Sequence, residues 1–312
     1  MTATLARDED LVLPFLLERA NVRGRLVRLA GTADWVLRAH DYPEPVTRQL
    51  AELLVLGASF VGALKFEGVF SLQVRGQGPV HFLVVDVTNE GTLRGYAGFD
   101  RERVARLART DATGLLGGGG LLVLTVDQRQ AGGELQQGIV RLGGGTLAEA
   151  LVEYFRRSEQ IPTAVRTACG RDPLTGRWRA AGILLQAMPG EARGTREERE
   201  EDWRRVVMLL ETVREAELLD ETLTPEALLY RLFHEERVQV FAPVSVQPGC
   251  SCTRERVEAM LLGFPAGEIE SMRLEDGGIE VTCRFCNRRY RLAREEVDAL
   301  VRRRRAREEA RS

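Results

Sequence analysis

The chain has 312 residues, enough for one large domain and a smaller one, and its 44% apolar and 6% aromatic content is ordinary for a globular protein. A net charge of −2 gives no general attraction to nucleic acid or to anionic membranes. The longest apolar run, Leu53 to Leu64, has 12 residues against the roughly 20 of a membrane span, and the first residues lack the basic start of an export signal. We therefore expect a cytoplasmic protein without a membrane segment.

Residues 1–190 predict an α+β domain that combines a mixed sheet with helices. Pro43 opens a helical pattern that runs toward Leu64, and a second helix is predicted over Thr146–Arg157, with an apolar stripe along one face. Between these helices, alternating or continuous apolar runs predict five strands. They are expected at Phe66–Arg75, His81–Val87, Thr92–Tyr96, Leu121–Asp127 and Gly138–Leu142.

The character of the sequence changes at Pro189-Gly190, and residues 191–243 predict a charged helical linker. Thr195 followed by Glu198 is a capping-box pattern for a helix start, and Thr224-Pro225 marks a second start. A narrow apolar stripe runs along the first of these helices, which is otherwise rich in Glu, Asp and Arg. Its residues are Trp203, Val206, Val207, Leu210 and Val213. Because this segment has little apolar surface of its own, we expect it to be ordered only when it docks on a neighbouring part of the protein.

The last part of the chain, residues 244–312, predicts a small metal-binding domain, because four of the five cysteines lie there in two close pairs. They are Cys250, Cys252, Cys283 and Cys286. Zn²⁺ favours four tetrahedral ligands and soft thiolates, and each short pair supplies two ligands from one turn. Gly277-Gly278 followed by Ile279–Val281 predicts a hairpin strand that delivers the second pair. We therefore predict one zinc ion on four thiolates. In a reducing cytoplasm, clustered cysteines indicate metal or redox chemistry more often than structural disulfides.

Two other interpretations of the cysteines were weighed against a metal site. Free buried cysteines pack as small hydrophobic side chains, but that role does not explain two close pairs in one polar segment. A thiol–disulfide oxidoreductase carries its C-x-x-C motif at a helix start after a strand of a βαβ unit, and no such unit is evident here. Neither a Ser/His/Asp pattern nor a pair of carboxylates stands out elsewhere, so the sequence does not predict an enzyme.

The predicted site has a consequence for folding. Zinc binding contributes about 10–16 kcal/mol in small zinc peptides, and that free energy is folding free energy. A segment of about 70 residues has little core stability of its own, so oxidation of the thiolates removes the metal and most of what folds the segment. Zinc-bound thiolates stay nucleophilic, and Arg284, Arg288 and Arg289 favour anionic sulfur. This chemistry leaves open whether the site is purely structural or a redox trigger.

The cysteine spacing belongs to a wider pattern. Cys250-Ser251-Cys252 followed by Cys283-x-x-Cys286-Asn287 resembles the zinc centre of the heat-shock protein 33 (Hsp33) family of redox-regulated chaperones. Further stretches similar to this family occur along nearly the whole chain. They are Val22–Gly24, His40–Pro43, Leu64–Gly68, Gly76–Val80, Tyr154–Gln160 and Leu232–Glu236. No single stretch is specific, but their order together with the cysteine spacing is. Gln136 departs from the pattern, because an aromatic residue is expected there.

The resemblance implies a chaperone that holds unfolding proteins without ATP, and not an enzyme. In such a protein the reduced, zinc-bound form is inactive. Oxidation, aided by heat, joins Cys250 to Cys252 and Cys283 to Cys286 and releases the zinc. The charged linker then loses its docking partner and unfolds, which exposes apolar surface that binds unfolding client proteins. The active form is expected to be a homodimer.

The remaining polar residues favour simpler roles. Cys169 is expected to be a buried or incidental thiol, and three scattered histidines suggest no metal site. They are His40, His81 and His234. The alternative function is a zinc module that binds nucleic acid through the basic run Arg302–Arg305. Glu308 and Glu309 offset that run, and no aromatic residues alternate with the arginines to stack on bases, so a nucleic-acid partner is not favoured.

Overall fold

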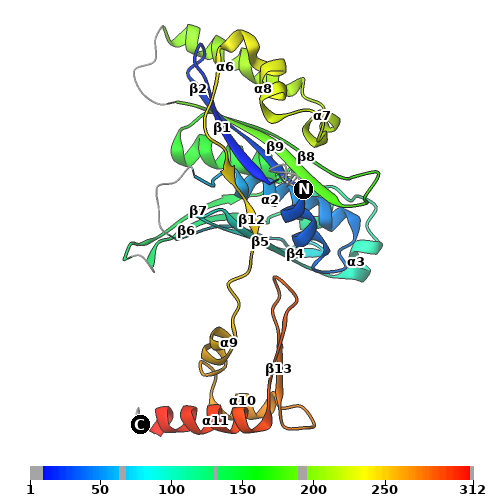
Figure 1. Cartoon of the computed structure of the whole chain (residues 1–312), viewed down its shortest axis with the longest axis vertical. Coiled ribbons are helices and arrows are strands. Elements are labelled where there is room, and N and C mark those ends of the chain that lie inside the picture. The colour runs from blue at the N-terminus through cyan, green and yellow to red at the C-terminus, as the bar shows by residue number, and fades with distance from the viewer. Residues whose placement is uncertain (1–9, 63–67, 130–131, 189–194, 310–312) are drawn as a thin grey trace, which may run out of the picture. The chain divides into compact units, whose positions relative to one another are not determined.

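The structure is a computed structural model of the chain, and it describes residues 10–62, 68–129, 132–188 and 195–309 (Figure 1). Contacts within the chain define two units, Met1–Gly249 and Cys250–Ser312. The three-part division predicted from the sequence stays a prediction, and its boundary at Pro189-Gly190 lies outside the described residues. Among the described residues, no helix combines the length and the apolar character that crossing a bilayer requires.

The predicted α+β class is confirmed, and two six-stranded sheets form the first unit. Sheet A has the strand order β10–β1–β2–β9–β8, with β11 also paired to β1, and sheet B has the order β12–β5–β4–β3–β6–β7. Neighbouring strands are antiparallel, except that β12 runs parallel to β5. Sheet A consists of β1 (Leu11–Leu17), β2 (Val22–Leu29), β8 (Thr163–Arg171), β9 (Trp178–Ala187), β10 (Val238–Val240) and β11 (Val244–Ser245). Sheet B consists of β3 (Val69–Arg75), β4 (Val80–Thr88), β5 (Thr92–Phe99), β6 (Leu121–Asp127), β7 (Leu135–Arg141) and β12 (Gln247–Pro248).

The five strands predicted from the sequence are confirmed as β3 to β7, with ends shifted by a few residues. Leu121–Asp127 matches β6 without any shift, whereas the strand expected at Gly138–Leu142 begins earlier, at Leu135. The predicted start at Phe66 lies outside the described residues. None of the six strands of sheet A was predicted.

Helix α2 (Glu44–Ala58) lies between the two sheets and contacts strands of both (Figure 1). It begins directly after Pro43, as predicted, and eleven of its residues are buried. A helix that is apolar on nearly all sides must be covered on all sides. α2 is therefore the centre of the main hydrophobic core. The other helices of this part are α1 (Gly31–Arg38), α3 (Arg101–Ala105), α4 (Ala112–Leu116) and α5 (Leu147–Tyr154).

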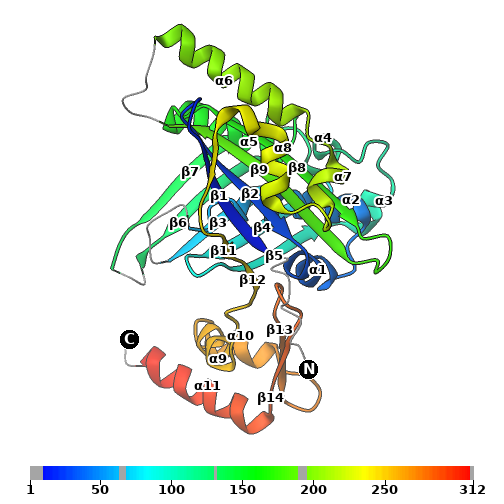
Figure 2. The same ribbon diagram turned by 45° about the horizontal axis from the view of Figure 1, so that its top comes forward.

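Three helices from the predicted linker cover the other face of sheet A (Figure 2). They are α6 (Arg196–Glu211), α7 (Glu215–Leu219) and α8 (Pro225–Phe233). Thr195 caps α6 with Glu198 in a capping box, and Thr224 caps α8 with Pro225 in the first turn, so both predicted helix starts are confirmed. Of the predicted stripe on α6, Val206 and Leu210 are buried in a second core, together with apolar residues of β1, β2 and β9.

The second unit is built around a two-stranded hairpin and three helices. The strand predicted after Gly277-Gly278 is confirmed as β13 (Ile279–Thr282), which pairs antiparallel with β14 (Arg289–Leu292). The helices are α9 (Arg254–Leu261), α10 (Ala266–Ser271) and α11 (Arg294–Glu309). Ten buried apolar residues, Ile269 and Val297 among them, form a small core of their own.

Candidate metal centre

The four predicted cysteines come together from two turns of the second unit. Cys250 and Cys252 lie just before α9, and Cys283 and Cys286 lie in the connection between β13 and β14. Local contacts fix the first turn: Thr253 caps α9 by accepting the amide of Arg256, whose guanidinium donates to the carbonyl of Ser251 at 3.0 Å. The helix start and the cysteine loop are therefore one structural element.

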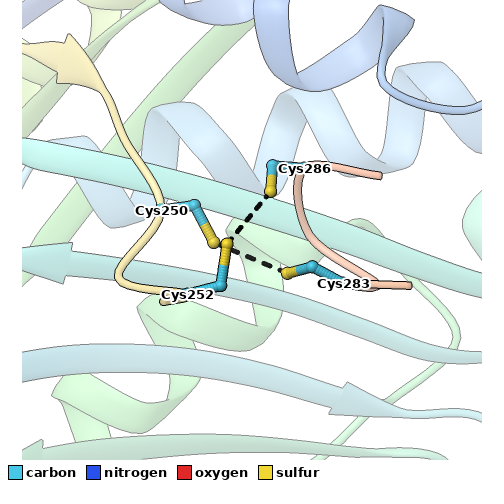
Figure 3. Close-up of side chains that lie close together, drawn as sticks. All are labelled: Cys250, Cys252, Cys283 and Cys286. Atoms are coloured by element: carbon cyan, nitrogen blue, oxygen red, sulfur yellow. Dashed lines mark hydrogen bonds between the residues drawn. The ribbon is translucent and has the colours of Figure 1, made fainter. Parts of the chain in front are cut away.

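The second pair lies in a tight, hydrogen-bonded turn. The amide of Cys283 donates to the carbonyl of Arg288 at 2.9 Å, and the amide of Asn287 donates back to the carbonyl of Cys283 at 2.9 Å. Asn287 has a φ of 58°, in the left-handed region that asparagine tolerates better than most side chains. The turn directs both thiols toward the Cys250–Cys252 loop (Figure 3).

The distances between the sulfurs fit a metal. All four Sγ atoms lie within 4.8 Å of one another. The Sγ atoms of Cys250 and Cys283 are 3.6 Å apart, and those of Cys252 and Cys286 are 3.3 Å apart (Figure 3). Four sulfurs bound to one zinc at about 2.3 Å stand roughly 3.8 Å from one another, so small shifts are enough to accommodate the ion. All four cysteines are half-buried and none of them is in a disulfide, which suits a closed, four-coordinate structural site.

The four thiols do not share one electrostatic environment. Burial raises the pKa of Cys286 to about 12, and hydrogen bonding with neighbouring thiols adds to this. For Cys252, burial also acts to raise the pKa, but hydrogen bonds from Tyr290 and the other cysteines outweigh it and lower the pKa to about 7. In the protein without metal, the thiolate of Cys252 is therefore formed more easily than that of Cys286. Divalent metal would favour the deprotonated form of all four, since the thiolate is the ligand.

The other candidates from the sequence lie away from any such cluster. Cys169 lies on β8, and burial raises the pKa of its thiol to about 12, as expected of an unreactive protonated cysteine. His40 packs against Tyr42 and Tyr96 at ring-centre distances of 5.3 and 5.4 Å. Within residues 10–62, 68–129, 132–188 and 195–309, the four cysteines are the only group of three or more side chains placed to hold a metal.

Part of the basic run near the C-terminus is neutralised by acidic neighbours. Arg304 pairs with Glu308 at 3.0 Å, and Arg305 lies 3.8 Å from Glu270. The predicted offset by Glu308 is therefore confirmed.

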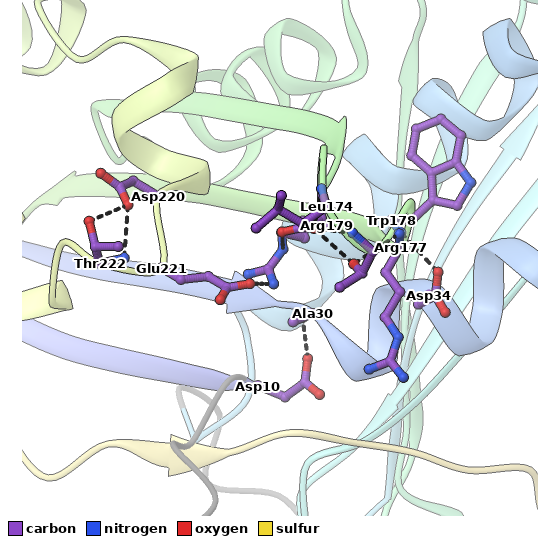
Figure 4. Close-up of polar contacts among 12 residues, drawn as sticks. Asp10, Ala30, Asp34, Leu174, Arg177, Trp178, Arg179, Asp220, Glu221 and Thr222 are labelled. Carbon is purple, nitrogen blue, oxygen red and sulfur yellow. Dashed lines mark hydrogen bonds and ion pairs between the residues drawn. The ribbon is translucent and has the colours of Figure 1, made fainter.

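Polar contacts fasten the linker helices to sheet A. Arg179 of β9 forms an ion pair with Glu221, in the turn between α7 and α8 (Figure 4). Arg179 also lies 3.4 Å from Asp172. Asp220 shapes the same turn by accepting from the amide and the hydroxyl of Thr222 at 2.8 and 2.7 Å (Figure 4). The turn is thus held in a fixed conformation against the strand.

A second ion pair lies within the linker itself. The guanidinium of Arg205 on α6 donates to both carboxylate oxygens of Glu236, at 2.7 and 3.1 Å. Glu236 is only 1% exposed, and removal of Arg205 would leave its carboxylate buried without this compensating guanidinium. The pair joins α6 to the short 3-10 helix His234–Glu236 that follows α8.

The contact between the linker and sheet A is incompletely filled. A cavity of about 390 Å³ lies between the α7–α8 turn and strands β1, β2 and β9, and Arg28 and Leu218 are among its lining residues. Among the described residues, the buried Nε and Nη2 atoms of Arg28 have no hydrogen-bond partner. Burial lowers the pKa of Arg28, and the nearby carboxylates of Asp220 and Glu226 offset only part of this effect. A gap in the packing and two buried nitrogen atoms without hydrogen bonds both weaken docking.

Sequence reasoning identified the cysteines but missed other residues around them and under the linker. Arg179, Arg205, Arg28 and Tyr290 were not predicted to matter. The contacts of Arg179 with Glu221, of Arg205 with Glu236 and of Tyr290 with Cys252 join residues far apart in the sequence, and the burial of Arg28 depends on helices that lie far along the chain, so no local pattern marks these residues.

Comparisons with known proteins agree along nearly the whole chain. A family model described as "Hsp33 protein" matches residues 10–293. The chain is 42% identical over 294 residues to the "33 kDa chaperonin" of Caulobacter vibrioides, covering 91% of this chain and 95% of that protein. It is 39% identical over 297 residues to the protein of the same name from Azotobacter vinelandii, covering 94% and 95%. A crystal structure of the 33 kDa chaperonin (heat shock protein 33 homologue) from Thermotoga maritima matches with a TM-score of 0.77 and 25% identity, covering 94% of this chain and 98% of that one.

Proposed function

The chain belongs to the Hsp33 family and is a chaperone, and from this premise we propose that it is a redox-regulated holdase that binds unfolding proteins without ATP. The observation that carries the proposal is the convergence of four cysteine sulfurs within 4.8 Å of one another in a unit that has only a small core. Such a unit depends on its metal for folding. Oxidation of the four thiolates would therefore release the metal and unfold this unit.

The metal is proposed to be one zinc ion held by Cys250, Cys252, Cys283 and Cys286. Bound zinc would supply the cross-link between the two turns and most of the folding free energy of the unit. The protein's contribution is to hold the two turns in place, through the α9 cap on one side and the Cys283–Asn287 turn on the other.

Peroxide or hypochlorous acid is the proposed trigger. Each disulfide forms when two thiols give up two electrons and two protons, and one hydrogen peroxide accepts them to become two waters. The pairing of Cys250 with Cys252 and of Cys283 with Cys286 follows from the resemblance to the family. The two short sulfur–sulfur distances join Cys250 to Cys283, at 3.6 Å, and Cys252 to Cys286, at 3.3 Å. Proximity in the reduced protein therefore does not by itself favour the proposed disulfide pairing.

The proposed response to oxidation is release of α6–α8 from sheet A, with residues 191–243 acting as the linker. The cavity beside Arg28, and the lack of hydrogen-bond partners among the described residues for the buried Nε and Nη2 atoms of its guanidinium, support the view that this docking is only marginally stable. Release would expose the apolar face made by residues such as Leu13, Leu26 and Ile183, which are buried under the helices. Apolar surface of this kind is what an unfolding client binds. We include in the proposal that the active form is a homodimer in the cytoplasm.

The decisive experiment follows the aggregation of a thermally unfolding client by light scattering. Reduced, zinc-loaded protein is compared with protein treated with peroxide at elevated temperature, and zinc content is measured on both samples. Suppression of aggregation by the oxidised sample alone, together with loss of its zinc, is the expected result. If neither sample protects the client, the proposal fails. If both protect it equally, the chaperone is not switched by oxidation.

A further inference from the structure

Tyr290 lies on the hairpin that carries the second cysteine pair, but it contacts the first pair. It is part of β14, four residues after Cys286, and stands opposite Val281 in the register of the hairpin. Its ring is partly buried against the small core of the second unit. The position of its hydroxyl is therefore fixed by packing at the ring and by strand pairing at the backbone.

The hydroxyl of Tyr290 has two acceptors, and both belong to Cys252. It lies 2.8 Å from the carbonyl oxygen of Cys252 and 3.2 Å from its Sγ. One hydroxyl carries one proton, so the hydrogen bond is shared between them. Either form ties the Cys250–Cys252 loop to the β13–β14 hairpin through protein atoms alone.

We propose that Tyr290 is a positioning residue of the metal centre, and that its hydroxyl slows the loss of metal and sets how much oxidant is needed to release it. This inference rests on the proposed function. Without the hydrogen bond, the segment after the cysteine loop would still contact the hairpin through Arg254, whose guanidinium donates to the carbonyl of Arg291 at 3.0 Å. Cys250 and Cys252 would then be held beside the hairpin less directly, and each opening of their loop would take two ligands away from the ion. With it, the loop stays beside the hairpin and can rebind.

The same hydrogen bond acts on the sulfur itself. A donor to a ligating sulfur withdraws electron density from it, and a less electron-rich sulfur attacks peroxide more slowly. Both effects of Tyr290 therefore have the same direction, since each retards oxidative release. Partners beyond the ligands typically change metal affinity by about 10–100-fold when they are removed.

The test uses the full-length reduced protein loaded with zinc, and compares wild type with Tyr290→Phe. The measurement is the rate of zinc transfer to a chromogenic chelator, first without oxidant and then across a peroxide titration. We expect Tyr290→Phe to release zinc on the order of tenfold faster and at a lower peroxide concentration. Cobalt(II) substitution supplies a second readout, because the sulfur-to-cobalt charge-transfer band should shift when the hydrogen bond to Cys252 is lost.

Two further variants distinguish the effect of the Tyr290 hydroxyl on zinc release from the effect of its ring. Tyr230→Phe removes a hydroxyl from an exposed tyrosine of α8 and should release zinc at the wild-type rate. Tyr290→Leu removes the ring as well and should be at least as fast as Tyr290→Phe. Wild-type rates in Tyr290→Phe, with faster release only in Tyr290→Leu, would overturn the inference, because ring packing alone would then matter. Absence of zinc from the wild-type protein would instead overturn the proposed metal centre.

Discussion

The rings of Phe15 and Phe233 lie 6.0 Å apart between centres, with their planes inclined by 26°. Phe15 belongs to β1 and Phe233 ends α8, and both are fully buried. Phe15 can take this position because its neighbour across the strands is Gly24, where an added Cβ would stand 2.0 Å from the Phe15 ring. The pair is thus the aromatic centre of the contact between the linker helices and sheet A.

Replacing Phe233 with Ala should release the linker without any oxidant. Loss of a buried phenylalanine costs about 3–5 kcal/mol, more than a marginal docking can supply. We expect the reduced, zinc-loaded variant to be cleaved faster by protease within α6–α8 and to suppress client aggregation before peroxide is added. Tyr230→Ala, at an exposed position on the same helix, is the matched control. Equal behaviour of Phe233→Ala and wild type would show that client binding does not require release of the linker.

Replacing Arg28 with Met should have the opposite effect. The change removes a buried guanidinium whose Nε and Nη2 atoms are unpartnered and puts apolar atoms against the cavity. An unsatisfied buried donor costs about 1–3 kcal/mol, so docking should become tighter by roughly 1 kcal/mol after the lost attraction to Asp220 and Glu226 is subtracted. Hydrogen exchange of the α7 and α8 amides in the reduced protein should slow about fivefold.

The control for Arg28→Met is Arg25→Met, on the same strand. Arg25 also has a buried Nε without a hydrogen-bond partner among the described residues, but an odd number of positions places it on the opposite face of β2. This variant should change the global stability of the unit without slowing exchange in α7 and α8. Unchanged or faster exchange in Arg28→Met would contradict the role assigned to the guanidinium.

Glu52 should make the stability of the first unit depend on pH. Its carboxylate accepts the Ala148 amide at the start of α5, at 2.8 Å, but burial dominates and raises the pKa of Glu52 from 4.5 to about 7. Between these values the folded protein keeps a proton that the unfolded chain has lost. The free energy of unfolding should therefore fall by about 1.4 kcal/mol per pH unit, roughly 3 kcal/mol from pH 4.5 to 7, with no further loss above that.

Denaturant unfolding of the wild type and of Glu52→Gln, measured across this pH range, tests the assignment. The amide cannot ionise, so Glu52→Gln should lack this component of the pH dependence and should be the more stable protein at pH 8. Parallel curves for the two proteins would place the pH dependence elsewhere.

Replacing Cys283 with Ser should weaken zinc binding and unfold the second unit while leaving the first intact. The serine hydroxyl is a poor ligand for zinc, and a unit of this size keeps little stability without its metal. Zinc analysis and near-UV circular dichroism after reduction and reconstitution would measure both effects. Cys169→Ser, on β8 in the first unit, should retain one zinc per chain. Full zinc content and an unchanged peroxide response in Cys283→Ser would contradict the ligand assignment.

Five strands of sheet B could be predicted from the sequence and those of sheet A could not, because the two sets of strands differ in their hydrophobic patterns. Strands β3 to β7 show alternating or short apolar runs between turn residues. Strand β9 is buried along nearly its whole length and is rich in Ala, Gly and Leu, so it lacks a period of two. Strand β1 contains Pro14, which normally argues against an interior strand. On the side of β1 that faces β10 and β11, Pro14 lies between the residues paired with β10 and those paired with β11, so strand pairing is interrupted at this position.

The same distinction separates the parts of the site that were predicted from those that were not. The cysteine pairs are local motifs, and their spacing alone predicts two turns that converge. Tyr290 and Cys252 are 38 residues apart, and Arg205 and Glu236 are 31 apart. Each of these contacts depends on how separate elements pack, which the order of the residues does not reveal.

The short strands that follow α8 constrain how a disturbance travels along the backbone. β10 and β11 pair with β1 at the edge of sheet A, and β12 then crosses to β5 at the edge of sheet B, directly before Cys250. A loss of order that starts at Cys250 has three ladders to break, in the sequence β12, β11, β10, before it reaches α8. The first ladder is only two residues long. The two-residue ladder between β12 and β5 therefore decides how far unfolding travels. If it stays paired, unfolding stops at Gly249; if it breaks, unfolding can continue along the chain toward α8.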